Sequence, residues 1–151
     1  MPLLRSPELM ARLQKVGEYL RFQSALEQRI SEFIMLVVSR EWTQHFEWKT
    51  HVPLGLKAGI AQDTIAALAV GRRPGAMAED EAVAYDFCDE LFRTKGVSEA
   101  TYRRAVAAFG ENGVIDMIGV AGYFTTVSMV MNVAHSPPED RAASGLMPYP
   151  M

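Results

Sequence analysis

The segment Phe46-Glu47-Trp48-Lys49-Thr50-His51 carries the most specific pattern in this 151-residue chain. On a helix, Gln44, Glu47 and His51 lie at positions i, i+3 and i+7 and therefore share one face. A carboxylate one turn before an imidazole can hydrogen-bond the ring, raise its pKa toward neutrality and fix which nitrogen carries the proton. That pairing suits general acid–base chemistry, although the same spacing on an exposed helix often gives only an ion pair worth about 0.3 kcal/mol.

The residues around this segment predict a helix from about residue 41 to residue 58, because Gly59 is a typical stop beyond the last turn. Pro53 lies inside this range. A proline removes one helical hydrogen bond and clashes with the carbonyl four residues back, so we expect a kink next to His51.

Further outward, hydrophobic periodicity predicts helices and no strand, for about seven helices in all. The other expected ranges are 7–21, 26–38, 63–70, 79–95 and 98–109, followed by a long apolar helix after Asn112-Gly113. Ser6 and Ser98 stand at positions that favour helix caps. Residues 1–135 are expected to form one domain, and residues 136–151 a Pro-rich C-terminal tail or an arm laid on a neighbour.

The composition excludes several classes of partner. A formal net charge of -3 leaves no basic field for nucleic acid or an anionic membrane surface. Cys88 is the only cysteine, which excludes an internal disulfide and agrees with a reducing, cytoplasmic location. Residues 1–21 carry charges throughout, unlike a secretory signal.

Several sequence words together resemble the core signature of the carboxymuconolactone decarboxylase-like proteins. They are residues 29–33, the Glu-Trp-x-x-His-Val-Pro words at 47–53 and Ala58-Gly59, with Phe46 where the family commonly has tyrosine. The similarity extends to residues 6–9, to Gly122-Tyr123-Phe124 and to Asn132, and so covers about residues 3–135. It implies an all-α, single-domain helical bundle of the alkylhydroperoxidase D-like type.

The resemblance also implies which residues act. The related thiol peroxidase branch uses a glutamate followed by Cys-x-x-Cys-x-x-x-His. When this motif is aligned on His51, Glu32 matches its glutamate, and Gln44 and Glu47 stand at the positions of the two cysteines. A thiol peroxidase needs one thiolate to attack peroxide and a second thiol to resolve the product, and both are missing. The proton-handling groups His51, Glu47 and Glu32 remain as the candidate catalytic residues.

Together with these groups, the resemblance implies a lyase that acts on a small cyclic or unsaturated carboxylate from aromatic catabolism. A lactone decarboxylase needs a group that holds the substrate carboxylate and an acid that protonates carbon as carbon dioxide leaves. His51 would be that acid and Glu47 its orienting partner. The alternatives are a non-peroxidatic member of the superfamily that binds a small apolar ligand, or another proton-transfer enzyme such as an isomerase or hydrolase.

Gln44, Trp48 and Tyr123 are the candidate substrate-binding residues. Two carboxylates and an imidazole form a known ligand set for a divalent ion, but the spacing here is generic, so we expect neither a metal nor another cofactor. Residues 117–134 contain no charge, and a helix this apolar has too many sides to cover within one small subunit. With the family's assembly, this predicts a homo-oligomer, a trimer or a hexamer, rather than a membrane span.

Overall fold

The computed structural model describes residues 2–135 and 144–146, and all regular structure in these ranges is helical. A 3-10 turn, η1 (Pro2–Arg5), precedes six α-helices: α1 (Pro7–Phe22), α2 (Gln28–Glu41), α3 (His45–Ala58), α4 (Gln62–Ala69), α5 (Glu79–Thr94) and α6 (Glu99–Val133). The prediction of an all-α bundle is confirmed, with six α-helices in the described ranges where about seven were expected.

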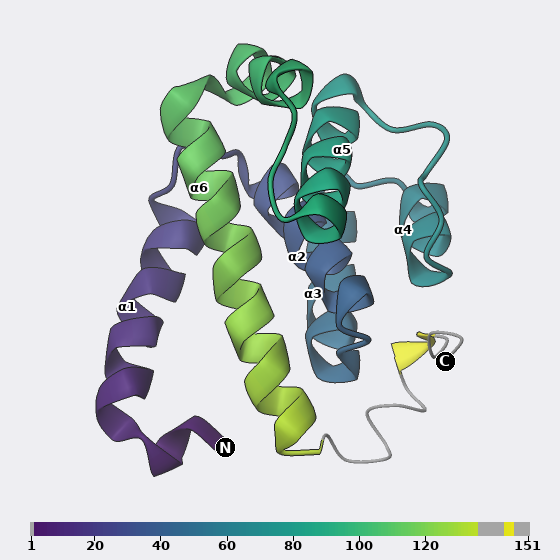
Figure 1. Cartoon of the computed structure of the whole chain (residues 1–151). Coiled ribbons are helices and arrows are strands. Elements are labelled where there is room, and N and C mark those ends of the chain that lie inside the picture. Colours follow the sequence, from purple (N-terminus) through teal and green to yellow (C-terminus); the bar gives the residue numbers. More distant parts are fainter. Residues whose placement is uncertain (1, 136–143, 147–151) are drawn as a thin grey trace.

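The difference in helix number lies at Gly110. The two helices expected around residues 98–109 and 114–134 follow each other without a loop and form the single element α6. Gly110 alone leaves the helical conformation, with φ 72° and ψ 168°, a region that glycine enters at little cost. Figure 1 shows the first turns of α6 running in a different direction from the rest of the helix.

Helix α2 lies in the middle of the bundle and packs against α3, α4, α5 and α6. Every side chain from Ile30 to Arg40 is buried, so its polar residues are buried along with the apolar ones. The polar residues Glu27, Gln28, Arg29 and Ser31 predict one exposed face, and Glu27 and Gln28 are exposed. Ser31 and the neighbouring Glu32, however, are each only 2% exposed. Polar groups at this depth need partners inside the protein.

Helix α6 runs between α1 on one side and the α2–α3 pair on the other (Figure 1). A buried carboxylate, Asp116, attaches α1 to it. The Tyr19 hydroxyl donates to Asp116 at 3.1 Å, and the backbone N–H of Ala25 donates to the same carboxylate at 2.7 Å. Gly17 lets α1 approach closely, because a Cβ there would lie 2.4 Å from the Tyr123 hydroxyl.

The ends of the helices follow the sequence signals in part. Ser98 caps α6 as expected, since its hydroxyl accepts from the backbone N–H of Thr101. Ser6 precedes α1 and Pro7, but its side chain makes no capping hydrogen bond. The sequence can place a capping residue without fixing whether the hydroxyl turns toward the helix.

Helix α3 differs from the expectation at its start. It begins at His45, not near Glu41, because a turn separates it from α2. It continues through Pro53 to Ala58 without a break in the helix, and Gly59 ends it at φ 104° as predicted. A kink at a proline is compatible with an unbroken helix, so the kink expected next to His51 stays a prediction.

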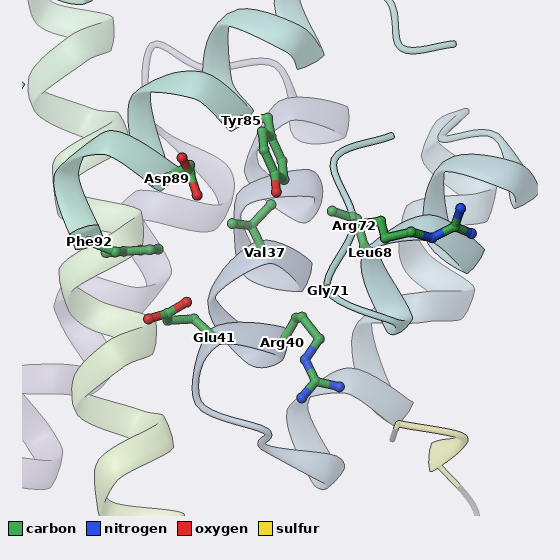
Figure 2. A pocket seen from close by; sticks show the side chains of 9 residues that line it. All are labelled: Val37, Arg40, Glu41, Leu68, Gly71, Arg72, Tyr85, Asp89 and Phe92. Atoms are coloured by element: carbon green, nitrogen blue, oxygen red, sulfur yellow. The ribbon is translucent and has the colours of Figure 1, made fainter. Parts of the chain in front are cut away.

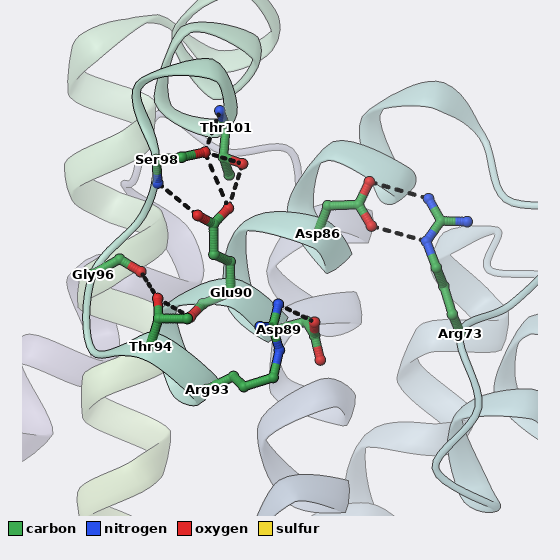
Figure 3. A network of polar contacts seen from close by, with 9 residues as sticks. All are labelled: Arg73, Asp86, Asp89, Glu90, Arg93, Thr94, Gly96, Ser98 and Thr101. Atoms are coloured by element: carbon green, nitrogen blue, oxygen red, sulfur yellow. Dashed lines mark hydrogen bonds and ion pairs between the residues drawn. The ribbon is translucent and has the colours of Figure 1, made fainter.

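A polar network joins α5 to the start of α6 (Figure 3). The Glu90 carboxylate accepts from the backbone N–H of Ser98 at 2.6 Å and from the Thr101 hydroxyl. One turn earlier on α5, Asp86 accepts from Arg73 at 2.8 Å. These contacts fix the loops around α5, far from the polar cluster on α2 and α3.

Most of the expected C-terminal tail lies outside the described residues. In the described stretch 144–146, Leu146 is 5% exposed and belongs to the core, and the Ser144 hydroxyl lies 2.6 Å from Nδ1 of His45. This part of the tail therefore packs on its own chain.

By length and composition alone, α6 is the one helix in the described ranges that could cross a membrane. In its most apolar window, 39% of the residues are buried inside the subunit. Met117, Val120 and Phe124 of this helix belong to the core. A helix in the core of a globular protein passes the same test, so this finding is weak evidence for a membrane span.

Candidate active site

The turn between α2 and α3 fixes the first residues of α3. Gln44 Oε1 accepts from the backbone N–H groups of Phe46 at 2.7 Å and Glu47 at 3.3 Å. Gln44 Nε2 donates to Asn132 Oδ1 at 2.9 Å, and Asn132 Nδ2 donates to the Trp42 carbonyl at 2.8 Å. The start of α3 is thus bound to the end of α6, which sets the position of Glu47.

Close packing of α3 on α2 brings the polar groups together. A Cβ on Gly55 would lie 3.2 Å from a methyl carbon of Leu36, so a glycine suits this approach. His51 Nδ1 lies 2.7 Å from Glu32 Oε2, and His51 Nε2 lies 3.4 Å from Glu47 Oε2. The imidazole is therefore held between two carboxylates, one from each helix.

The environment of His51 favours its protonated form. Burial by itself lowers the pKa of the ring, but the hydrogen bonds and charges of Glu32 and Glu47 outweigh burial and raise the His51 pKa to about 8. With a proton on each nitrogen, the ring donates toward both carboxylates, whereas a neutral ring would turn a lone pair toward one of them. At neutral pH His51 is an imidazolium, a proton donor.

A cavity of about 760 Å³ opens against this cluster, between α1, α3 and α6. Its volume lies within the range of about 300–1,000 Å³ that is usual for small-molecule sites. Glu47 and His51 line it, and most of the remaining wall is apolar, including Met10, Leu13, Phe22, Phe46, Phe124 and Val127. The Phe124 ring meets the His51 ring edge-on at a centroid distance of 5.2 Å.

Glu32 does not line this cavity and lies behind the imidazole, on its Nδ1 side. The sequence-based hypothesis made Glu47 the orienting partner of His51 and placed Glu32 nearby. The distances favour Glu32 as the orienting partner, because its contact to the ring is 2.7 Å and that of Glu47 is 3.4 Å. Glu47 faces the cavity instead.

The three expected substrate-binding residues lie in different places. Tyr123 lines the cavity beside Glu47 and His51. Gln44 is fully buried as the cap of α3, so its side chain has a structural task. Trp48 is 3% exposed and lines a separate cavity of about 280 Å³ on the other side of α3.

Helix α1 supplies much of the cavity wall, and sequence reasoning assigned it no functional residue. Gln14, Glu18 and Arg21 line the cavity from α1, together with Thr50 from α3. Their spacing of three and four residues indicates one face of a helix, but the sequence does not show that this face covers the cavity.

The described residues contain no group of three or more His, Cys, Asp or Glu side chains arranged to hold a metal ion. In the cluster of His51, Glu32 and Glu47, each ring nitrogen faces a carboxylate oxygen and so has no lone pair directed at a shared ion.

A smaller cavity of about 90 Å³ lies between α2, α4 and α5 (Figure 2). Arg40 on its wall donates to the Ala69 carbonyl at 3.0 Å and to the Thr43 hydroxyl at 2.9 Å, which braces α2 against α4. The space holds only a few waters at about 30 Å³ each. None of the expected site residues borders it.

Cys88 has none of the properties of a reactive thiol. It is fully buried on α5 and is the only cysteine of the chain. Burial, with a smaller contribution from the charge of Asp89, raises the pKa of its thiol to about 12. Because a peroxidatic cycle needs an accessible thiolate and a resolving partner, Cys88 cannot supply that chemistry.

The fold and the site define a class: an all-α protein with an imidazole between two carboxylates at the wall of an apolar cavity. Residues 7–88 match the sequence pattern of the Carboxymuconolactone decarboxylase family. The match covers just over half of the chain and includes Glu32, Glu47 and His51, so the protein belongs to this family.

A solved structure shares the fold. It is an uncharacterized peroxidase-related protein from Silicibacter sp. TM1040, with a TM-score of 0.75 and 19% sequence identity. The alignment covers 89% of this chain and 73% of that one. At this identity the likeness shows the fold alone, and it confirms the bundle expected from the sequence. No protein of curated function matches the chain.

Proposed function

We propose that the protein is a decarboxylase-like lyase that delivers a proton to carbon in a small cyclic or unsaturated carboxylate of aromatic catabolism. The observation that carries the proposal is the position of His51, between Glu32 and Glu47 and at the wall of the 760 Å³ cavity. Membership of the family supports the same class of chemistry.

In the proposed reaction, the bond between the substrate carbon and its carboxylate breaks and carbon dioxide leaves without the electron pair. The pair stays on carbon and spreads into the adjacent unsaturation. The His51 imidazolium, directly or through Glu47, supplies the proton of the new C–H bond, and the ring regains a proton from water. Glu32 holds Nδ1 and acts as a positioning residue.

The proposal is tested with a panel of unsaturated carboxylates and carboxylated lactones in D₂O. We expect release of carbon dioxide from at least one compound, with one deuteron at the carbon that lost it, because the proton on His51 exchanges with solvent. Absence of carbon dioxide from the whole panel would count against a lyase.

The alternative functions give different results in the same assay. An isomerase would exchange or move a proton without loss of carbon dioxide, and a hydrolase would open a lactone. The mostly apolar cavity wall also suits a protein that only binds a small apolar ligand, and such a protein would leave every compound unchanged.

We also propose that the chain forms a homo-oligomer, a trimer or a hexamer. Large apolar side chains remain exposed on the faces of α1 and α6 that no other element covers, among them Val16, Phe22, Ile115, Ile118 and Val133. Exposed apolar side chains on this scale, where they join into one patch, mark an interface. We expect light scattering at micromolar concentration to give three or six times the chain mass of 16.8 kDa. A mass of one chain would refute the proposal.

A further inference from the structure

Charged side chains of both signs line the cavity. Glu47 lies beside His51 on α3 and Glu18 projects from α1, and each carboxylate repels an anionic group of a ligand placed next to it. Besides His51, whose charge Glu32 and Glu47 offset, Arg21 is the one cationic side chain among the described residues that line the cavity. A ligand that carries a negative charge can therefore place it at a cation that no carboxylate of the described residues contacts.

Arg21 has no competing partner within the described residues. Several other arginines are paired, for example Arg12 with Glu8 and Arg73 with Asp86. Arg21 forms no ion pair in the ranges that the structure describes, although Glu18 lies one turn away on the same helix. Its guanidinium lies 5.1 Å from the centre of the Phe22 ring, and Phe22 lines the same cavity. Stacking on an aromatic ring leaves the N–H groups at the edge of a guanidinium available to a ligand.

Tyr123 lines the same cavity as Glu47 and Arg21, and its hydroxyl packs against Gly17 of α1. Burial and the charge of Glu47 raise the pKa of the Tyr123 phenol, while the charge of Arg21 lowers it. The phenol is therefore protonated at neutral pH. Its O–H is a second donor for an anion placed near Arg21.

We propose that Arg21 anchors an anionic group that the substrate keeps through the reaction, while the apolar body lies between α1 and α6 and the reacting carbon reaches Glu47 and His51. The substrate is then an amphipathic carboxylate with its retained charge away from the reacting carbon. That the carbon beside Glu47 and His51 is the one that reacts rests on the proposed function. Anchoring by Arg21 does not depend on turnover.

Binding of two inert probes tests the anchor. The probes are 4-phenylbutanoate and its uncharged amide, measured by calorimetry on the intact protein. For the unmodified protein we expect the carboxylate to bind about tenfold more tightly than the amide, which is the effect of about 1.4 kcal/mol from one favourable charge contact. R21Q should remove this preference and leave the affinity for the amide unchanged.

R12Q is the matched control, because Arg12 is an exposed arginine of the same helix that pairs with Glu8 and does not line the cavity. It should keep the preference for the carboxylate. Equal binding of the two probes, failure of both to bind at millimolar concentration, or a preference that survives R21Q would each overturn the anchor.

His51→Asn separates the anchor from the proposed function. The anchor predicts that this variant still prefers the carboxylate. If the preference follows Arg21 and no compound of the panel loses carbon dioxide, the anchor stands and the proposed lyase fails. If turnover depends on His51 while R21Q binds both probes as the unmodified protein does, the lyase stands and the anchor fails.

Discussion

Glu47→Gln and His51→Asn should each lower kcat/KM by about 10²- to 10⁴-fold on any substrate that the panel identifies, the usual loss when a general acid is removed. In the proposed reaction His51 donates the proton, and Glu47 lies 3.4 Å from its Nε2 on the cavity side. The measurement is steady-state release of carbon dioxide by purified variants.

The double variant should lose little more than either single variant, because residues that act as one unit are strongly non-additive. Glu27→Gln is the matched control, since Glu27 is an exposed glutamate that caps α2 without a side-chain hydrogen bond. Independent losses that multiply in the double variant would show that the two residues do not share one proton.

Thermal melting of the same samples separates catalysis from stability. His51→Asn leaves Glu32, at 2% exposure, without its cation, and an unpaired buried charge costs several kcal/mol. We therefore expect this variant to melt lower, and the added change Glu32→Gln to restore part of the loss without restoring activity. A lower melting temperature with intact turnover would make the cluster structural.

The sequence predicted the helices where the periodicity of apolar residues is strong, and it predicted the contact between Glu47 and His51 because both lie on one helix. It brought in Glu32 only through the resemblance, since the 2.7 Å contact to His51 depends on how α2 packs on α3. Packing of this kind is a tertiary property and leaves no spacing rule in the sequence.

The other differences between the predictions and the structure also arise from tertiary packing. Gln44 shares the helical face of Glu47 by spacing, but its side chain turns back to cap α3 and bind Asn132, 88 positions away along the chain. In the sequence Arg21 has the pattern of an ordinary surface arginine, and only the packing of α1 shows that it lines the cavity. Asn112-Gly113 was expected to precede a separate helix, yet Gly110 alone leaves the helical conformation and bends α6 without a loop.

The pH dependence of stability follows from the raised pKa of His51. A histidine whose pKa is about 8 in the folded state and 6.5 in the unfolded state adds stability that is fully present below pH 6.5. This contribution, about 2 kcal/mol for a shift of this size, is lost as the pH rises through 8. Activity should fall over the same upper range. The neutral ring has lost the second proton, which is the one that the imidazolium donates in the proposed reaction.

Glu32→Gln should move both profiles toward lower pH by about one unit or more. Burial lowers the His51 pKa, and the hydrogen bond that the ring donates to the Glu32 carboxylate is the largest effect that raises it. The His51 pKa therefore falls when that carboxylate becomes an amide. The readout is the titration of the His51 ring by NMR, assigned by its loss in His51→Asn, together with the pH profile of kcat. The amide keeps the size of the side chain and can still contact Nδ1, so a purely structural role would leave the upper limb of the kcat profile where it is. A His51 titration that does not move in Glu32→Gln would show that Glu32 does not set the charge of the ring and would leave Glu47 as the partner that does.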